Sequence, residues 1–353
     1  MTKTGNLQEA RLRSHAANSS GAPPLSPSPP IITEDQEPAE FVDSLYRAIL
    51  LREPDGAGRA THLRLLHEGM SRVDLIKMFI ASPEFKGKTE SRGFVPLGAP
   101  AMDVQCRASS SQLSRLINRV SEAWTALGAA RPYHSVLTLK ELLPENITEA
   151  AIKRFWDSGA SEGSQIKAIL LRHGFQNAAS KTCLEYGCGL GRMTVVLANI
   201  FKKVYAYDIS PGHLEVAQKH SAQLDFDNIE FKLCNKNIFA NNLHPCEFFY
   251  SRIVFQHNPP PLIGKLISMA MRSLQVDGVG VFQVPTYASK YRFNLDEYLE
   301  YTEKPEMEMH AIPQTEIFNL IADAGCRILE VREDNSVGWH SWISNTFIVK
   351  RTI

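Results

Sequence analysis

The alternation of short hydrophobic runs with helical periodicity after Ser164 is the feature that most constrains the fold. In chain order it predicts the helix "QIKAILLRHGF", strand Thr182–Tyr186, helix Met193–Phe201, strand Val204–Ile209, helix His213–Leu224, strands Ile229–Leu233 and Phe248–Phe255, helix Leu262–Leu274, strand Val279–Val284, helix Thr315–Ala324, and strands Arg327–Arg332 and Thr346–Lys350. Strands that alternate with helices of this length form a parallel, doubly wound sheet, so the predicted fold class is α/β. The last two strands have no helix between them and should pair antiparallel.

Composition and periodicity divide the chain into four parts. Residues 1–37 are rich in Ser, Pro, Ala and Gly and predict a disordered tail, because they cannot bury enough apolar surface. Residues 38–92 have helical periodicity interrupted by breakers, which predicts a small all-α module. Residues 93–130 predict a linker and a helix near Ser110–Leu127 that could pack on either neighbour, and residues 131–353 form the α/β domain.

Charge and cysteine content exclude several classes of protein. The 38 basic and 38 acidic residues cancel, so the overall charge indicates neither a nucleic-acid partner nor an anionic membrane. The six cysteines form no CxxC pair and are expected to be free thiols in a reducing compartment. No apolar leader or membrane-length run is present, which predicts a cytoplasmic protein and leaves peripheral docking at a membrane biosynthetic complex open. No His, Cys, Asp or Glu spacing indicates a metal site.

A glycine-rich turn follows the first strand of the predicted sheet. Gly187, Gly189 and Gly191 stand where this strand meets its helix, and doubly wound sheets bind ligands at that edge. Glycine permits positive φ and lets a ligand approach the backbone. The G-x-G-x-G spacing is weak evidence by itself, because a glycine turn can arise there by chance.

Two acidic residues make the turn more informative. Glu185, two residues before Gly187, would repel the pyrophosphate that a dinucleotide presents to such a turn. Asp208 ends the second strand, about 20 residues on, at the separation where an acid accepts hydrogen bonds from ribose hydroxyls. The combination predicts a nucleoside with a cationic tail and no phosphate.

Four segments together resemble one enzyme family. "LEYGCGLGRMT" and "YAYDIS" are similar to the first two motifs of the class I S-adenosylmethionine-dependent methyltransferases, "YSRIVFQHNPPP" to their fourth-strand motif, and "SLQVDGVGVFQVP" to their fifth. The resemblance covers about Tyr133 to Arg351, including the final hairpin. It implies a Rossmann-like methyltransferase sheet with an antiparallel last strand, and S-adenosyl-L-methionine as the cofactor.

The resemblance also implies a cofactor site. In it, Glu185 and Gly187 would hold the methionine end, Gly189 and Gly191 would back the nucleoside, Asp208 would bind the ribose, Ile209 would pack on the adenine, and Cys188 and Ser251 would complete the set. Asn235 stands where the family often has an aspartate that accepts from the adenine amino group, and an amide oxygen can still accept that hydrogen bond. Lys236 and Asn237 are alternative neighbours of the adenine.

Methyl transfer needs an aligned nucleophile and, for a hydroxyl, a base. His257 follows the fourth strand, and the ordinary histidine pKa of about 6.5 suits a base; the alternative is that it caps the Pro-rich loop or packs under the cofactor. His310 and Glu308 lie in "EKPEMEMHAIPQ", where acceptor-binding insertions occur, although a solvated loop is also consistent. We predict His257 or His310 as the catalytic base and Glu308 as a substrate-binding residue.

Aromatic side chains near the same sheet edge are further candidates for acceptor binding. Tyr287 and Tyr291 follow the fifth strand and could stack on a sugar ring or form a small satellite core. Tyr133 and His134 precede the first strand, where related enzymes place a lid. Arg192, after the third glycine, is interpreted as a surface or ion-paired arginine.

The N-terminal helical segment has its own resemblance. "YRAILLREPDGAGRATHLRLLHEGMSRVDLIKMFIASPEF" is similar to a helical domain of unknown function that is related to phycobilisome linkers and found in polysaccharide-biosynthesis proteins. Ser71 is the expected N-cap of one of its helices. The resemblance implies a module that binds a protein partner, with a structural cap as the alternative.

That neighbourhood favours a glycan acceptor. The expected function is therefore O-methylation of a hydroxyl on a saccharide or glycolipid precursor of a surface polysaccharide. The alternatives are methylation of a small-molecule hydroxyl or amine, and a binding protein that keeps the fold without catalysis.

Overall fold

The computed structural model describes residues 33, 35–50, 52–85, 98–234, 238–239, 242–301, 306–334, 336–337 and 342–353. The chain divides into two compact units, residues 1–94 and 95–353. Within the described ranges, no helix is long and apolar enough to cross a membrane. All six cysteines are free, as expected, and five of them are buried.

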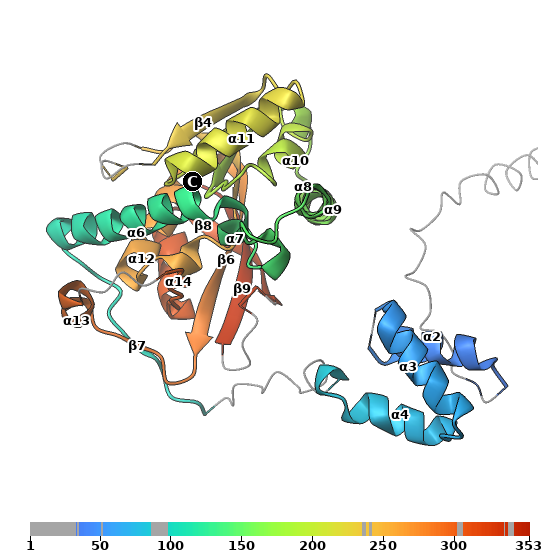
Figure 1. Cartoon of the computed structure of the whole chain (residues 1–353). Coiled ribbons are helices and arrows are strands. Elements are labelled where there is room, and N and C mark those ends of the chain that lie inside the picture. The colour runs from blue at the N-terminus through green and yellow to red at the C-terminus, as the bar shows by residue number, and fades with distance from the viewer. Residues whose placement is uncertain are drawn as a thin grey trace, which may run out of the picture. The chain divides into compact units, whose positions relative to one another are not determined.

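The described part of the first unit contains the helices α2 (Pro38–Ala48), α3 (Gly56–His67) and α4 (Arg72–Ala81) (Figure 1). Their apolar faces share one core, which is centred on the buried side chains of Phe41, Leu45, Leu75 and Phe79. Ser71 accepts a hydrogen bond from the Asp74 N–H at the start of α4, which confirms the predicted N-cap.

The signature "YRAILLREPDGAG" holds these helices together. The Tyr46 hydroxyl contacts His62 Nδ1 at 3.0 Å, and a Cβ at Gly58 would lie 2.2 Å from that hydroxyl oxygen. Arg52 donates to Glu84 at 2.7 Å and to Asp55 at 3.1 Å, while Asp55 caps α3. The residue types of this motif therefore have a structural explanation, and the expected protein partner stays a prediction.

The second unit is built on a seven-stranded sheet. Its spatial order is β4 (Ile229–Leu233), β3 (Lys203–Asp208), β2 (Thr182–Tyr186), β5 (Cys246–Ser251), β6 (Leu274–Ala288), β9 (Trp342–Arg351) and β8 (Cys326–Asp334). Neighbouring strands are parallel from β4 to β6, and β9 runs antiparallel to both β6 and β8. The predicted doubly wound sheet with an antiparallel last pair is confirmed.

Helices cover both faces of this sheet (Figure 1). Successive strand residues point to opposite faces, so Cys183 and Phe248 pack with α9 (Gly159–Arg172) and α10 (Thr194–Ala198). Leu184 and Phe249 pack on the other face with α6 (Ser110–Ala130), α12 (Pro260–Ser273) and α14 (Gln314–Asp323). The remaining elements are β1 (Asp103–Val104) paired with β7 (Arg292–Phe293), α7 (Pro132–Val136), η1 (Lys140–Leu142), α8 (Glu149–Asp157), η2 (Ala178–Ser180), α11 (Pro211–Gln223), η3 (Phe255–His257) and α13 (Leu295–Glu300).

Several predicted elements have different bounds in the structure. The predicted strand Phe248–Phe255 ends at Ser251, because Ile253 takes a positive φ of 56° and the chain then enters η3. The helix predicted over Met193–Phe201 contains only Thr194–Ala198. Strand β6 is longer than predicted, because its pairing with β9 continues to Ala288.

Helix α6, whose packing position the sequence left open, crosses α11 at two glycines. A Cβ at Gly212 would lie 2.9 Å from the carbonyl oxygen of Gly128, and a Cβ at Gly128 would lie 2.0 Å from Ser210 Oγ. Only glycines permit this approach, since the first of these contacts is with backbone that cannot move aside. The crossing holds α6 against α11 within the second unit.

We expect Gly212→Ala to lower the free energy of unfolding of the second unit by about 1–3 kcal/mol, because the added methyl overpacks the crossing. Urea unfolding followed by tryptophan fluorescence measures this unit alone, since all four tryptophans lie in residues 95–353. Gly98→Ala is the control, because no atom lies within 4 Å of its Cβ position. Equal stability of the two variants would contradict the steric account.

Candidate active site

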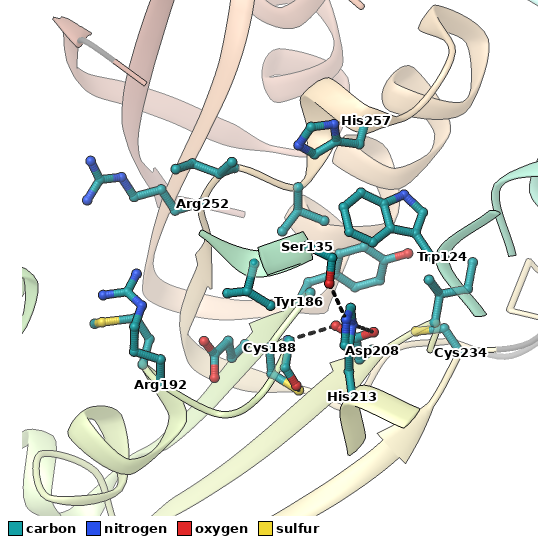
Figure 2. A pocket seen from close by; sticks show the side chains of 18 of the residues that line it. Trp124, Ser135, Tyr186, Cys188, Arg192, Asp208, His213, Cys234, Arg252 and His257 are labelled. Atoms are coloured by element: carbon teal, nitrogen blue, oxygen red, sulfur yellow. Dashed lines mark hydrogen bonds and ion pairs between the residues drawn. The ribbon is translucent and has the colours of Figure 1, made fainter. Parts of the chain in front are cut away.

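A pocket of about 990 Å³, counting space open to solvent, lies at the carboxyl ends of β2, β3 and β5 (Figure 2). The turn after β2 forms its floor, and α6 and α7 contribute Trp124, Ser135 and Val136 to its walls. The position is where a doubly wound sheet binds its ligand.

Glycine is required in the turn for conformation and for space. Gly187, Gly189 and Gly191 have φ values of 78°, 54° and 85°, which side chains rarely adopt. A Cβ at Gly187 would lie 2.2 Å from Val254 Cγ2, and one at Gly189 would lie 3.0 Å from Val136 Cγ2. The turn is therefore closely covered by apolar side chains from both sides.

Four backbone N–H groups of the turn are already hydrogen-bonded within the protein. Gly187 and Cys188 donate to the Tyr207 carbonyl oxygen at 2.7 and 2.9 Å. Gly189 donates to Asp208 Oδ2 at 2.7 Å, and Gly191 donates to the Cys188 carbonyl at 2.9 Å. A phosphate site at a glycine turn relies on free N–H groups that point at the anion. These four amides are not available for one.

Glu185 lies buried at the end of β2, where Thr194 Oγ1 donates to its Oε2 at 2.6 Å. Burial raises the pKa of Glu185 to about 8, and the nearby carboxylates of Glu162 and Asp208 act in the same direction. A cation beside this carboxyl would favour its ionised form. The site thus presents an acid that a positively charged ligand can convert to a carboxylate.

Asp208 is fixed from three directions. Its Oδ2 accepts from Gly189 N–H, and its Oδ1 accepts from Ser210 N–H at 2.8 Å and lies 3.5 Å from His213 Nδ1. The other ring nitrogen of His213 contacts Ser135 Oγ at 2.8 Å (Figure 2). Asp208 is therefore connected through His213 to α7, the helix that covers the turn.

The opposite end of the pocket is cationic, with Arg192 and Arg252 lying away from Trp124 (Figure 2). Glu162 ion-pairs with Arg192 at 3.0 Å and with Arg252 at 3.1 Å and accepts from the Tyr250 hydroxyl, which confirms the interpretation of Arg192 as ion-paired. Burial alone would raise the pKa of Glu162, but the two guanidinium groups lower it. Because Arg192 and Arg252 share the single carboxylate of Glu162, one positive charge is left to bind a carboxylate of a ligand.

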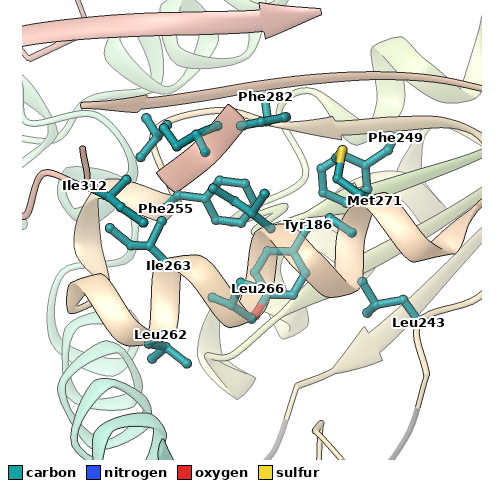
Figure 3. Close-up of a cluster of buried hydrophobic side chains, with 14 of the residues drawn as sticks. Tyr186, Leu243, Phe249, Phe255, Leu262, Ile263, Leu266, Met271, Phe282 and Ile312 are labelled. Carbon is teal, nitrogen blue, oxygen red and sulfur yellow. The ribbon is translucent and has the colours of Figure 1, made fainter. Parts of the chain in front are cut away.

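Helix η3 forms another part of the pocket wall and carries His257. Phe255 anchors this short helix in the core, with ring centroids 6.0 Å from Tyr186 and 5.8 Å from Phe282 (Figure 3). The His257 ring lies edge-on to Trp124, with centroids 5.1 Å apart. The histidine is thus held at the sheet edge by buried aromatic packing.

A directed chain of hydrogen bonds fixes the tautomer of His257. Ile253 N–H donates to Gln283 Oε1 at 2.8 Å, Gln283 Nε2 donates to Gln256 Oε1 at 3.0 Å, and Gln256 Nε2 contacts His257 Nε2 at 3.3 Å. His257 Nδ1 contacts the Glu308 carbonyl oxygen at 2.8 Å, and a carbonyl can only accept. The hydrogen therefore lies on Nδ1 and the lone pair on Nε2. Burial lowers the pKa of this ring to about 4.

Two family models match the sequence of the chain. Residues 183–278 match one described as "Methyltransferase domain", and residues 32–89 match one described as "Domain of unknown function (DUF4214)". The α/β unit carries a methyltransferase domain. The expected Rossmann-like methyltransferase fold is confirmed, and S-adenosyl-L-methionine is the cofactor that such a domain implies.

Solved methyltransferases resemble the chain at a distance. A magnesium protoporphyrin IX methyltransferase from Synechocystis PCC 6803 is 15% identical with a TM-score of 0.47, over 70% of this chain and 100% of that one. A methyltransferase from Clostridium acetobutylicum ATCC 824 is 15% identical with a TM-score of 0.43, and the match covers 54% of this chain and 91% of that one. A geranyl diphosphate C-methyltransferase from Streptomyces coelicolor A3(2) is 14% identical with a TM-score of 0.41, and the match covers 54% of this chain and 77% of that one. No curated protein matches. Likenesses this distant carry no argument about the acceptor.

Most of the predicted cofactor residues gather at the pocket of the methyltransferase domain. Its walls include Glu185, Gly187, Cys188, Gly189, Asp208 and Ile209. Gly191 closes the turn, and the hydroxyl of Ser251 donates to the Tyr186 carbonyl oxygen at 2.9 Å. Asn235, Lys236 and Asn237 lie outside the described residues.

Of the two candidate histidines, only His257 lines the pocket. His310 is buried behind it, where Nδ1 contacts the Tyr291 hydroxyl at 2.8 Å and Nε2 lies 3.4 Å from Glu308 Oε2. The backbone N–H of His310 donates to the Gln256 carbonyl oxygen at 2.8 Å. The structure thus brings His310, Tyr291 and Glu308 together as one cluster, outside the cofactor pocket.

The other aromatic candidates lie away from the pocket. Tyr287 donates through its hydroxyl to the Pro100 carbonyl at 3.3 Å. Tyr133 packs edge-on against Phe155, with centroids 5.2 Å apart, in a cluster under α8. His134 Nδ1 is buried and has no hydrogen-bond partner among the described residues. Their neighbours Ser135 and Val136, and not these two side chains, line the pocket.

Sequence reasoning missed several residues of the pocket wall, namely Trp124, Ser135, Glu162, His213 and Arg252. Arg252 follows the fourth strand directly, which is the signal that pointed to His257. Trp124 belongs to the apolar stripe of its helix and gives no separate signal. Glu162 is an acid on a helix face, and only the fold shows that two arginines surround it.

Proposed function

We propose that the methyltransferase domain transfers a methyl group from S-adenosylmethionine to a hydroxyl oxygen of a saccharide or glycolipid. The observation that carries the proposal is the combination of a glycine turn whose amides are already bonded, a buried Glu185 and an anchored Asp208 in one pocket. This combination disfavours phosphate and favours a nucleoside with a cationic group.

The residues present fit this methyl donor. Glu185 would hold the ammonium group of the methionine end. Arg192 would bind the carboxylate of the same methionine end, since the buried Nε of Arg192 has no hydrogen-bond partner among the described residues. Asp208 would accept from the ribose hydroxyls and Ile209 would pack against the adenine. When bound, S-adenosylmethionine supplies a methyl group on a sulfonium sulfur, which leaves as a neutral thioether.

The choice of base follows from the two histidines. His257 lines the pocket, whereas His310 lies outside it and contacts Tyr291 and Glu308. For His257 to act as the base, its Nε2 has to give up the 3.3 Å contact with Gln256 Nε2. As the acceptor oxygen forms its bond to the methyl carbon, the hydroxyl proton moves to His257 Nε2. A pKa of about 4 is adequate for this role, because a protonated ether is a far stronger acid than the imidazolium ion.

The saccharide assignment is supported by the first unit. Residues 32–89 match a domain of unknown function. The sequence of this segment resembles a helical domain that occurs in polysaccharide-biosynthesis proteins, and that resemblance favours a glycan precursor as acceptor. This support is an analogy between neighbouring domains and not an argument from the site. The N-terminal helices would then bring the enzyme to other proteins of the same biosynthetic system.

Asp208→Ala should weaken the affinity for S-adenosylhomocysteine by about 30- to 100-fold, since it removes charge-assisted hydrogen bonds to the ribose. Isothermal titration calorimetry on the full chain measures the change, and the exposed Asp157→Ala is the matched control. Absence of binding to the natural sequence, or undiminished binding by Asp208→Ala, would overturn the cofactor assignment.

His257→Asn should reduce the rate of methyl transfer by about 100-fold or more at saturating cofactor and leave the affinity for S-adenosylhomocysteine unchanged. Because its pKa is lowered to about 4, His257 is neutral above that pH, so the natural enzyme should keep its rate from pH 8 down to about 5. Transfer of labelled methyl groups to an extract of the source organism measures both effects, with His173→Asn as control. A decline centred near pH 6.5, or a fully active His257→Asn variant, would contradict this role.

A further inference from the structure

A second cavity lies beside the cofactor pocket and shares three wall residues with it, Val120, Trp124 and His257. Its other walls come from α6, from α13 and from the segment that carries Glu308. The two cavities therefore adjoin at a shared wall that contains the proposed base. A methyl acceptor has to reach the donor from a space that borders this wall.

The second cavity carries charged side chains whose formal charges cancel, beside apolar side chains such as Val120, Leu299 and Met307. Among the described residues that line it, two are arginines, Arg115 and Arg119, and two are glutamates, Glu122 and Glu308. Small-molecule pockets are usually mostly apolar. A site with this many charged and amide groups, including Asn118, offers many hydrogen bonds.

The charged groups are held in place by one another. Arg119 lies 4.0 Å from Glu308 Oε1 and stands over the Tyr298 ring at 4.7 Å, and the Tyr298 hydroxyl donates to Glu308. Burial would raise the pKa of Glu308, but hydrogen bonds from His310 and Tyr298 lower it. His310 is thus a positioning residue that keeps this carboxylate ionised and oriented. No net positive charge remains to attract a phosphate or a carboxylate on the ligand.

Aromatic rings provide the remaining contact area. Trp124 and Tyr298 both line the second cavity, and Trp124 stands at the wall shared with the cofactor pocket, edge-on to His257. Aromatic faces pack against the C–H groups of pyranose rings, while carboxylates and amides bind the hydroxyl groups around the ring. Such a mixture fits an uncharged ring that carries several hydroxyls.

We infer that the second cavity is the acceptor site, and that it takes a neutral polyhydroxylated ring such as an uncharged sugar residue. The inference rests on the proposed function, which it deepens by naming the site and the charge class of the acceptor. Phosphorylated sugars, uronic acids and amino sugars are disfavoured as the methylated ring, because the walls offer no uncompensated charge. Flat apolar acceptors are disfavoured, because they would leave the charged and amide groups of the cavity without hydrogen-bond partners.

Product analysis tests the acceptor class. The full chain is incubated with S-adenosylmethionine carrying a tritiated methyl group and with an extract of the source organism, and the labelled material is hydrolysed and separated. We expect the label in neutral O-methyl sugars. Label in uronic acids or amino sugars would overturn the inference and leave the proposed function, whereas label in isoprenoids or protein would overturn both. Absence of label from every fraction would instead count against the proposed function.

Substitutions in the wall test the location of the site. Asn118 and Glu122 are exposed residues of α6 that line the second cavity and not the cofactor pocket. Asn118→Ala and Glu122→Gln should each raise the KM for the labelled acceptor fraction about tenfold and leave the affinity for S-adenosylhomocysteine unchanged. Ser114→Ala, exposed on the same helix outside both cavities, is the control. An unchanged KM in both variants would overturn the location.

Discussion

The hydrogen bonds that fasten the glycine turn to strand β3 decide what the pocket can bind. Gly187 and Cys188 donate to the Tyr207 carbonyl, and Gly189 donates to Asp208. A phosphate would need those amides, and they already donate within the protein. The charge and shape of the pocket therefore select the ligand. The anchored carboxylate of Asp208 supplies negative charge, and the buried carboxyl of Glu185 ionises when a cation binds beside it. The same bonds thus hold the turn in place and exclude the commoner nucleotide cofactors.

The acceptor side depends on how two further elements reach this turn. Helix α6 crosses α11 where Gly128 and Gly212 allow close approach, and the crossing sets Trp124 beside the pocket. Segment η3 is fixed by Phe255 in the core and by the hydrogen-bond chain through Gln283. Donor and acceptor spaces then meet at one wall formed by an aromatic ring and an imidazole. Methyl transfer mainly requires such alignment of two bound groups.

Much of the fold was predictable because its signals are local. Strand and helix periodicities gave the sheet with its antiparallel pair, and Glu185 and Asp208 were found because each ends or nearly ends a strand. The turn after β5 was not predictable, since Ile253 adopts a positive φ without being glycine. The acceptor wall was missed for another reason. Its members on α6 meet α13 about 184 positions later in the chain, as in the contact of Arg115 with the Leu299 carbonyl. The apolar stripe of a helix shows which face is buried but not which polar residues meet at its rim.

The pH dependence of S-adenosylhomocysteine binding tests the central claim most directly. Because the pKa of Glu185 is raised to about 8 in the protein and a bound ammonium group requires the carboxylate, binding must release the Glu185 proton. Calorimetry should show the affinity rising about tenfold for each pH unit between about pH 6 and 8, and Glu185→Gln should remove this slope. An affinity that does not change with pH, or the same slope in Glu185→Gln, would contradict the account.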